Sequence, residues 1–229
     1  MLKINPLKIY IGYDSREHDA WHTCVDSIMK YAKSPVAIVP LKYENLPYFD
    51  REWDSQQSNS FAFTRFLVPY LNGYQGFAIF MDCDMMLRTD INEVMEKVNF
   101  TNNLWGNPKA VSVVKHDYIP KNKKKYLGAT QYAYPRKNWS SFVVWNCGHP
   151  SNWGLTPQVV NTQTGKYLHR FEWLSDDEIG SLDVKWNWLV GEYDNPPDDV
   201  KNVHWTVGGP WFDEFKNVDF SDEWRSYGR

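Results

Sequence analysis

The sequence lacks the marks of secreted, membrane-spanning and zinc-finger proteins. Only three of its 229 residues are cysteine, at positions 24, 83 and 147, an odd number without metal-finger spacing. No apolar run reaches membrane-spanning length, and residues 1–6 lack the apolar core of a signal peptide. These absences predict free thiols, no transmembrane segment and a cytoplasmic location.

The chain also has little that would divide it or attract nucleic acid. It contains no Gly/Ser-rich linker, no long block of like charge and no fixed-period repeat, which predicts one domain over residues 1–229, as a monomer or homodimer. Its formal net charge is -3 and its pI about 6.1, which argues against a dedicated nucleic-acid binder. Residues 121–125 are locally basic and read as a solvated loop; the alternative is contact with an anionic acceptor or a peripheral membrane surface.

What the sequence does contain is an alternation of apolar strands and amphipathic helices. It predicts strands over residues 8–14, 36–41, 77–81, 110–114 and 142–145, and helices over residues 17–31, 58–70, 90–98 and 156–163. This order is typical of an α/β sheet and not of a helix bundle or a β-sandwich. The irregular tail beyond residue 191 is of the kind that covers a site or forms part of one.

The most informative feature is a pair of aspartates, Asp82 and Asp84, at the end of the apolar strand 77–81. Residues i and i+2 of a strand point to the same side, so both carboxylates emerge together at its carboxyl end. Open α/β sheets bind ligands at that edge. Two carboxylates so close repel each other unless a cation or a shared proton lies between them, and a divalent metal with phosphate ligands is the simplest solution.

Two further clusters carry polar chemistry. His204 precedes the Gly208-Gly209-Pro210 turn, where glycines let the backbone bend closely around a ligand and leave amides free for an anion. A histidine added to two carboxylates gives a mixed ligand set that suits Mn²⁺ better than Mg²⁺. The acidic run of residues 176–178 either opens a helix or lines a pocket where positive charge develops on a sugar ring.

Several of these stretches, taken in order, resemble glycosyltransferase family 8, the family of glycogenin and of the bacterial lipooligosaccharide galactosyltransferases. The resemblance rests on residues 60–71 (SFAFTRFLVPYL), on the Asp82-Cys83-Asp84 strand and on the following Asp90-Ile91. The acidic run 176–178 lies where the family has Asp-Gln-Asp. Residues 186–187 and 204–211 are similar to its Trp/Tyr-Asn and His…Pro-Trp motifs.

The resemblance implies a single GT-A domain, a Rossmann-like nucleotide-diphospho-sugar transferase fold with a mixed central sheet. Residues 1–114 would form the nucleotide-sugar binding half and residues 115–229 the acceptor and catalytic half. The implied activity is retaining transfer of a hexose, glucose or galactose, from a UDP-sugar to the hydroxyl of a saccharide or other acceptor.

The resemblance also implies roles for individual residues. Mn²⁺, or else Mg²⁺, would be bound by Asp82, Asp84 and His204. The donor would be bound by Gly12, Tyr13, Asp14, Arg16, Arg65, Cys83, Gly208 and Gly209. Asp177 would lie nearest the reacting sugar, flanked by Asp176 and Glu178, and Arg65 would contact the donor or orient the aspartates.

The sequence departs from the family pattern at two positions. Asp177 stands where the family often has Gln, and a carboxylate there could act as a nucleophile or as an electrostatic stabiliser. The family's Lys before Pro-Trp is replaced by Gly209, so the amides of Gly208 and Gly209, or a basic residue such as Lys201, would have to neutralise the leaving diphosphate.

Three alternatives to an active transferase are compatible with parts of the sequence. A degenerate transferase would bind the donor without turnover, as the missing Lys suggests. An aromatic-rich carbohydrate-binding protein would account for the 12 tryptophans but not for the aspartate pair. A haloacid-dehalogenase-type phosphatase also has Asp-x-Asp at a strand end, but it requires Thr or Val where this chain has Met86.

Overall fold

The computed structural model describes residues 5–54, 57–98, 108–121, 124–128 and 130–228. Its centre is a six-stranded sheet in the order β2-β1-β3-β6-β5-β7. The bounds of these strands are Val36–Leu41, Leu7–Gly12, Phe77–Met81, Phe142–Asn146, Val111–Val114 and Ile179–Leu182. All run parallel except β6, which is antiparallel to both its neighbours, so the prediction of an α/β fold with a mixed sheet is confirmed.

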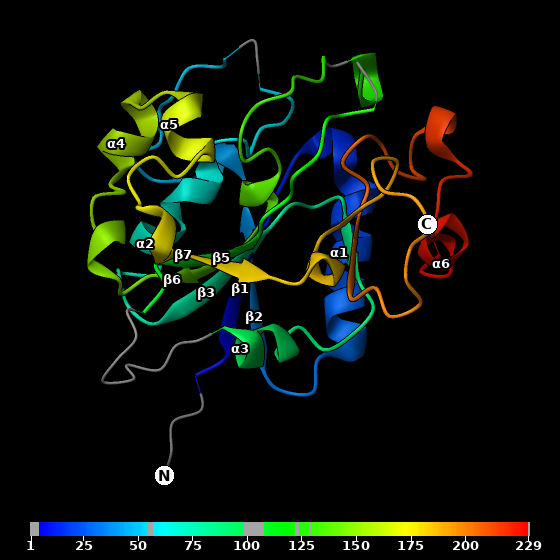
Figure 1. The fold of residues 1–229 in the computed structure, drawn as a ribbon, viewed down its shortest axis with the longest axis horizontal. Helices are drawn as coiled ribbons and strands as arrows, with labels where there is room; N and C mark the ends of the chain where they lie inside the picture. The colour runs from blue at the N-terminus through cyan, green and yellow to red at the C-terminus, as the bar shows by residue number, and fades with distance from the viewer. Residues whose placement is uncertain (1–4, 55–56, 99–107, 122–123, 129, 229) are drawn as a thin grey trace.

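Helices lie on both sides of this sheet (Figure 1), with α1 on one side and α2, α4 and α5 on the other, whereas α6 lies farther out, beyond α1. In chain order, the helices are α1 (His18–Tyr31), α2 (Val68–Leu71), α3 (Glu93–Lys97), α4 (Pro157–Thr162), α5 (Gly165–His169) and α6 (Ser221–Arg225). The apolar face predicted for α1 is buried at Ala20, Cys24 and Ile28. Within the described ranges, no helix combines the length and apolar character needed to cross a bilayer.

A second, three-stranded sheet was not predicted from the sequence. Its order is β4-β9-β8, and its strands are Met85–Leu87, Asn202–His204 and Trp188–Leu189. Strands of two or three residues are too short to show a periodic pattern. The antiparallel pairing of β4 with β9 places Met85 opposite His204 and so ties the C-terminal tail to the end of the aspartate strand.

Two predicted helices start later than expected. Residues 60–63 form turns ahead of a short 3-10 helix, Thr64–Leu67, that leads into α2. Pro69 has no N–H to donate to the carbonyl of Arg65, so a regular α-helix cannot run through this segment. The predicted N-cap Asp90 instead accepts hydrogen bonds from the backbone N–H and side-chain amide of Asn92, and α3 begins at Glu93.

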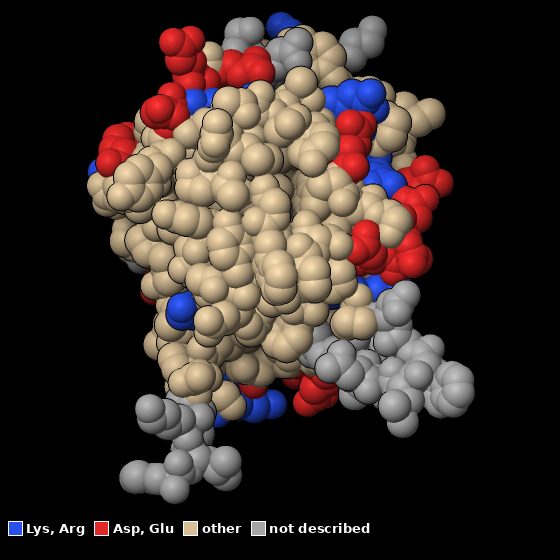
Figure 2. Space-filling view, turned by 90° about the vertical axis from the view of Figure 1, so that its left-hand side faces the viewer, with Lys and Arg blue, Asp and Glu red and all other residues tan. Residues whose placement is uncertain are grey.

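The buried side chains form one large cluster around the central sheet and a smaller one around the second sheet. Trp145, Trp186 and Trp205 are at most 1% exposed, so much of the tryptophan content serves the core and is unavailable to stack on sugars. Residues 138–165 contain no Lys, Arg, Asp or Glu. Figure 2 shows the corresponding weakly charged face, with acidic and basic side chains gathered at its margins.

Candidate metal and donor site

The two aspartates lie where β3 ends, at the carboxyl edge of the central sheet. The N–H of Asp82 donates to the carbonyl of Ser141 at 2.9 Å, which extends the pairing of β3 with β6 by one residue. The carbonyl of Asp84 accepts from the N–H of Trp205 at 3.0 Å, which joins the turn after β3 to the end of β9. Backbone pairing on both sides therefore fixes the positions of the two carboxylates, as the strand pattern predicted.

His204 completes a cluster with these two carboxylates. Its Nε2 lies 3.3 Å from Asp84 Oδ1 and 4.0 Å from Asp82 Oδ2. The other ring nitrogen, Nδ1, lies 2.8 Å from the side-chain oxygen of Asn187, whose amide group donates to Ser141 Oγ. Because Asn187 accepts from Nδ1–H, Nε2 is the ring nitrogen turned toward the aspartates, where it could bind a metal ion.

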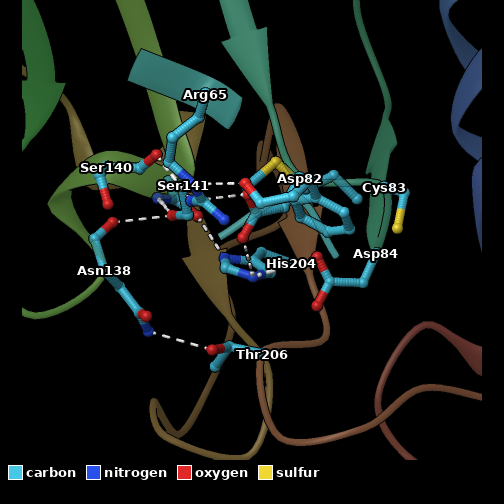
Figure 3. A network of polar contacts seen from close by, with 12 residues as sticks. Arg65, Asp82, Cys83, Asp84, Asn138, Ser140, Ser141, His204 and Thr206 are labelled. Carbon is cyan, nitrogen blue, oxygen red and sulfur yellow. Dashed lines mark hydrogen bonds and ion pairs between the residues drawn. The ribbon is translucent and has the colours of Figure 1, made fainter. Parts of the chain in front are cut away.

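Arg65 approaches the same cluster from the opposite side (Figure 3). Its guanidinium lies 2.8 Å from Asp82 Oδ1 and donates to the carbonyl of Ser140 at 2.9 Å. Ser140 is in turn hydrogen-bonded through Oγ to His169 Nδ1 at 2.8 Å. Arg65 thus orients Asp82, one of the two roles predicted for it. Residues 140–141, at the end of the 3-10 helix just before β6, hold both partners in place.

Asp82 and Asp84 are two carboxyl groups buried close together, and burial and nearby charges shift the pKa of each. Asp82 and Asp84 are 8% and 7% exposed. Burial raises the pKa of Asp82 to about 6 against the lowering effect of Arg65, whereas His204 brings the pKa of Asp84 below its usual value although burial opposes this. Asp84 Oδ1 is buried without a hydrogen-bond partner among the described residues. A divalent cation would coordinate this oxygen and would also offset the repulsion between the two carboxylates.

The residues present therefore fit a metal ion. One ligand atom from each of Asp82, Asp84 and His204 lies within 4.8 Å of the other two. Two carboxylates and a neutral imidazole leave further coordination positions for ligand oxygens. The cluster opens into a cavity of about 640 Å³, a size typical of small-molecule sites.

The first loop does not line this cavity. The carboxylate of Asp14 accepts hydrogen bonds from Arg16 and from the backbone and hydroxyl of Ser60, and Arg16 also donates to the carbonyl of Ser58. A Cβ on Gly12 would lie 2.2 Å from the Phe61 ring. Gly12, Asp14 and Arg16 thus contact residues 58–61, of which Ser58 and Asn59 line the cavity, whereas the resemblance implied that the first loop, Tyr13 included, binds the donor.

The glycine turn and Lys201 also differ from prediction. The N–H of Gly208 donates to the carbonyl of Trp205 and is not free for an anion. A Cβ on Gly208 or Gly209 would meet an aromatic ring at 2.4 or 2.0 Å, so both glycines allow close ring packing. Lys201 pairs with Glu93 at 2.7 Å, away from the cavity. Cys83 is fully buried with Sγ 4.0 Å from Glu17, so only its backbone could reach a donor.

The acidic run 176–178 lies at the opposite edge of the sheet, because it precedes β7, which runs parallel to β5 and so in the direction of β3. Asp176 forms an ion pair with Arg136. Glu178 accepts from the backbone and hydroxyl of Ser175 in a capping box, and Asp177 is exposed. None of the three lines the cavity, although the resemblance implied that Asp177 lies nearest the reacting sugar.

Several cavity residues belong to no motif in the sequence, although Lys125 falls in the locally basic stretch 121–125. Asn138 donates to Thr206 Oγ1 at 3.1 Å, and Lys125 Nζ donates to the same oxygen at 3.3 Å. The aromatic residues Tyr132 and Tyr134 line the cavity and are 55% and 36% exposed. These side chains come from residues 124–138, which the sequence showed only as a polar, aromatic-rich stretch.

Comparison with known proteins agrees with this architecture. No protein-family model matches the chain. Over 96% of the chain, the fold matches galactosyltransferase LgtC solved with donor and acceptor sugar analogues, with TM-score 0.56, 9% identity and 94% of that chain covered. It also matches GlyE of Streptococcus pneumoniae TIGR4, with TM-score 0.63, 11% identity and 98% of this chain covered, and the bifunctional glycosyltransferase WbbM, with TM-score 0.59, 16% identity and 99% covered. The chain spans 60% of the GlyE chain and 50% of the WbbM chain.

The fold is thus the GT-A fold of nucleotide-sugar glycosyltransferases, as expected from the resemblance to glycosyltransferase family 8. Among curated proteins, the chain is 45% identical over 226 residues to Protein CDI of Arabidopsis thaliana, a match that covers 96% of this chain and 85% of that protein. The chain belongs to the family of Protein CDI.

Proposed function

We propose that this protein is a Mn²⁺-dependent retaining glycosyltransferase that transfers a hexose from a UDP-sugar to an acceptor hydroxyl. The observation that carries the proposal is the buried Asp82/Asp84/His204 cluster, which opens into a large cavity at the ligand-binding edge of a GT-A sheet. LgtC, which shares this fold, was solved in complex with donor and acceptor sugar analogues, and this supports the same substrate class here.

The charge of the cavity suits a nucleotide diphosphate. Its wall includes five basic residues and three acidic ones, namely Arg51, Arg65, Lys125, Lys166 and Arg170 against Asp54, Asp82 and Asp84. A metal ion bound by the two central aspartates would supply Lewis-acid stabilisation of the departing diphosphate. Mg²⁺ is the second candidate because it also accepts carboxylate and phosphate oxygens.

The reaction would break the bond between the anomeric carbon and the β-phosphate oxygen, and the electron pair would stay on that oxygen. The acceptor hydroxyl would form the new bond on the same face and pass its proton to the departing phosphate oxygen. Asp82 and Arg65 would keep their ion pair throughout and fix the position of the donor. This route is favoured over a covalent intermediate because Asp177 lies outside the cavity.

Because the acidic run 176–178 does not line the cavity, one alternative is tested as well: a protein that binds nucleotide-sugars without turnover. The phosphatase alternative is given up because the chain has the GT-A fold.

The test is UDP release from a panel that includes UDP-glucose, UDP-galactose and UDP-glucuronate, with MnCl₂ and then with EDTA. We expect chelator-sensitive release from glucose or galactose donors, by hydrolysis or by transfer to added saccharides. Metal-dependent UDP binding without release from any donor or acceptor would identify the non-catalytic binder. Absence of both release and binding would overturn the proposal.

A further inference from the structure

The family resemblance led us to expect a lysine before Pro-Trp that neutralises the leaving diphosphate, but this chain lacks that lysine. Gly209 occupies that position, the N–H of Gly208 is already bonded to Trp205, and Lys201 forms an ion pair with Glu93. A diphosphate released in a buried site needs positive charge beyond one metal ion, because charge develops there as the bond breaks. Another basic residue is therefore required if the proposed function holds.

Lys125 is placed to meet this need. Its ammonium donates to Thr206 Oγ1 at 3.3 Å, two residues along the chain from His204, and it lines the same cavity as Asp82 and Asp84. No ion pair within the described ranges includes Lys125, so its charge is not neutralised by a neighbouring carboxylate. Burial lowers the pKa of this ammonium, while Asp84 and Asp82 act in the opposite direction and favour its charged form.

The segment that carries Lys125 is fixed by the residue that follows. The N–H of Tyr126 donates to the carbonyl of Val207 at 2.8 Å, and its hydroxyl donates to the buried Glu17 at 3.0 Å. The Tyr126 ring stacks on Phe212 with centroids 5.0 Å apart. Three contacts from one residue thus position Lys125 beside the His204 segment, although about 80 residues separate the two in sequence.

We propose that Lys125 binds the leaving phosphate of the nucleoside diphosphate and takes the place of the lysine that the His…Pro-Trp motif lacks. The inference rests on the proposed function. An ammonium with three donors and no acceptor can contact phosphate oxygens directly. The donor site would then be assembled from both halves of the chain.

The experiment is calorimetric titration of the full chain with UDP and with UMP at saturating MnCl₂. It compares wild type with Lys125→Met, Lys125→Arg and the matched control Lys201→Met. We expect Lys125→Met to weaken UDP binding roughly ten- to a hundredfold, the range for one charge-assisted hydrogen bond, and to weaken UMP binding less than threefold. Lys125→Arg should recover much of the loss because it keeps the positive charge, and Lys201→Met should bind like wild type.

The outcomes separate the inference from the function on which it rests. Wild-type UDP binding that persists unchanged in Lys125→Met would overturn the role of Lys125 and leave the transferase proposal standing. Equal weakening of UDP and UMP would also overturn it, because Lys125 would then act on the metal or the nucleoside. If wild type binds neither nucleotide with Mn²⁺, both the function and this inference fail. The melting temperature of each variant is measured to confirm that every protein compared is folded.

Discussion

The chain carries two acidic clusters, and the contrast between them shows what makes carboxylates suitable for metal binding. Asp82 and Asp84 leave β3 at the carboxyl edge of the sheet, are less than 10% exposed, and meet Arg65 and His204. Residues 176–178 precede β7 at the amino edge, where the Asp176 side chain is 88% exposed and Glu178 caps its own short helix. Water solvates the exposed acids of residues 176–178, whereas the two buried carboxylates repel each other unless a cation or a shared proton lies between them.

The largest expected difference between the clusters is in activity. Asp84→Ala should reduce Mn²⁺-dependent UDP release by about a hundredfold or more, because it removes a metal ligand. The folded state should survive, since the change also removes carboxylate repulsion with Asp82. The measurement is UDP release together with the Mn²⁺-induced rise in melting temperature, which should vanish. Wild-type stimulation by Mn²⁺ in this variant would contradict the assigned site.

The second test concerns the ion pairs of the two clusters. Arg65→Met should lower the free energy of unfolding of the metal-free protein by about 3 kcal/mol, because it leaves Asp82 buried without its cation. Asp176→Asn, which removes an exposed partner of Arg136, should cost less than about 1 kcal/mol. Denaturant titration at pH 7.5 measures both. Equal losses would mean that burial does not distinguish the pairs.

The third test uses two histidines that are largely shielded from water near the first cluster. Burial lowers the pKa of His116 and of His169 to about 3. In the unfolded chain each takes up a proton near pH 6.5 and the folded chain does not, so stability is lost as pH falls from about 6.5 toward 3. Each should lower the free energy of unfolding by about 2 kcal/mol between pH 8 and pH 5.

Comparison with His116→Gln isolates this contribution from that of Asp82, whose raised pKa of about 6 acts in the opposite direction. The variant should lose about 2 kcal/mol less than wild type over the same pH interval, as measured by urea unfolding. An unchanged difference between pH 8 and pH 5 would show that His116 titrates normally in the folded protein.

The smallest effects are expected at the exposed acids. Asp177→Ala should change UDP release less than about twofold, because this residue is exposed and does not line the cavity. Glu178→Gln should cost about 1 kcal/mol by weakening the hydrogen bonds to Ser175. A large activity loss in Asp177→Ala with unchanged stability would restore the catalytic role that the motif order suggested.

The strongest local patterns in the sequence predicted the corresponding parts of the structure. The predicted strands and the apolar face of α1 could be recognised because each is an apolar run or periodic pattern of at least four residues. Asp82 and Asp84 were predictable for the same reason, since strand geometry alone sends side chains two residues apart to the same side. The late start of the helix around Arg65 was harder to predict, because Pro69 and the hydrogen bond from Ser60 to Asp14 act together there.

The sequence by itself determined the α/β class and the place of the aspartate pair at the carboxyl edge of the sheet, since both follow from local periodicity. Only the tertiary structure decided that Asn187 directs His204 toward that pair, that Lys125 lines the same cavity and that residues 176–178 lie elsewhere. These placements depend on two- and three-residue strands and single hydrogen bonds between distant segments. Such contacts leave no repeating pattern in the sequence, because each is selected by the packing of the whole domain.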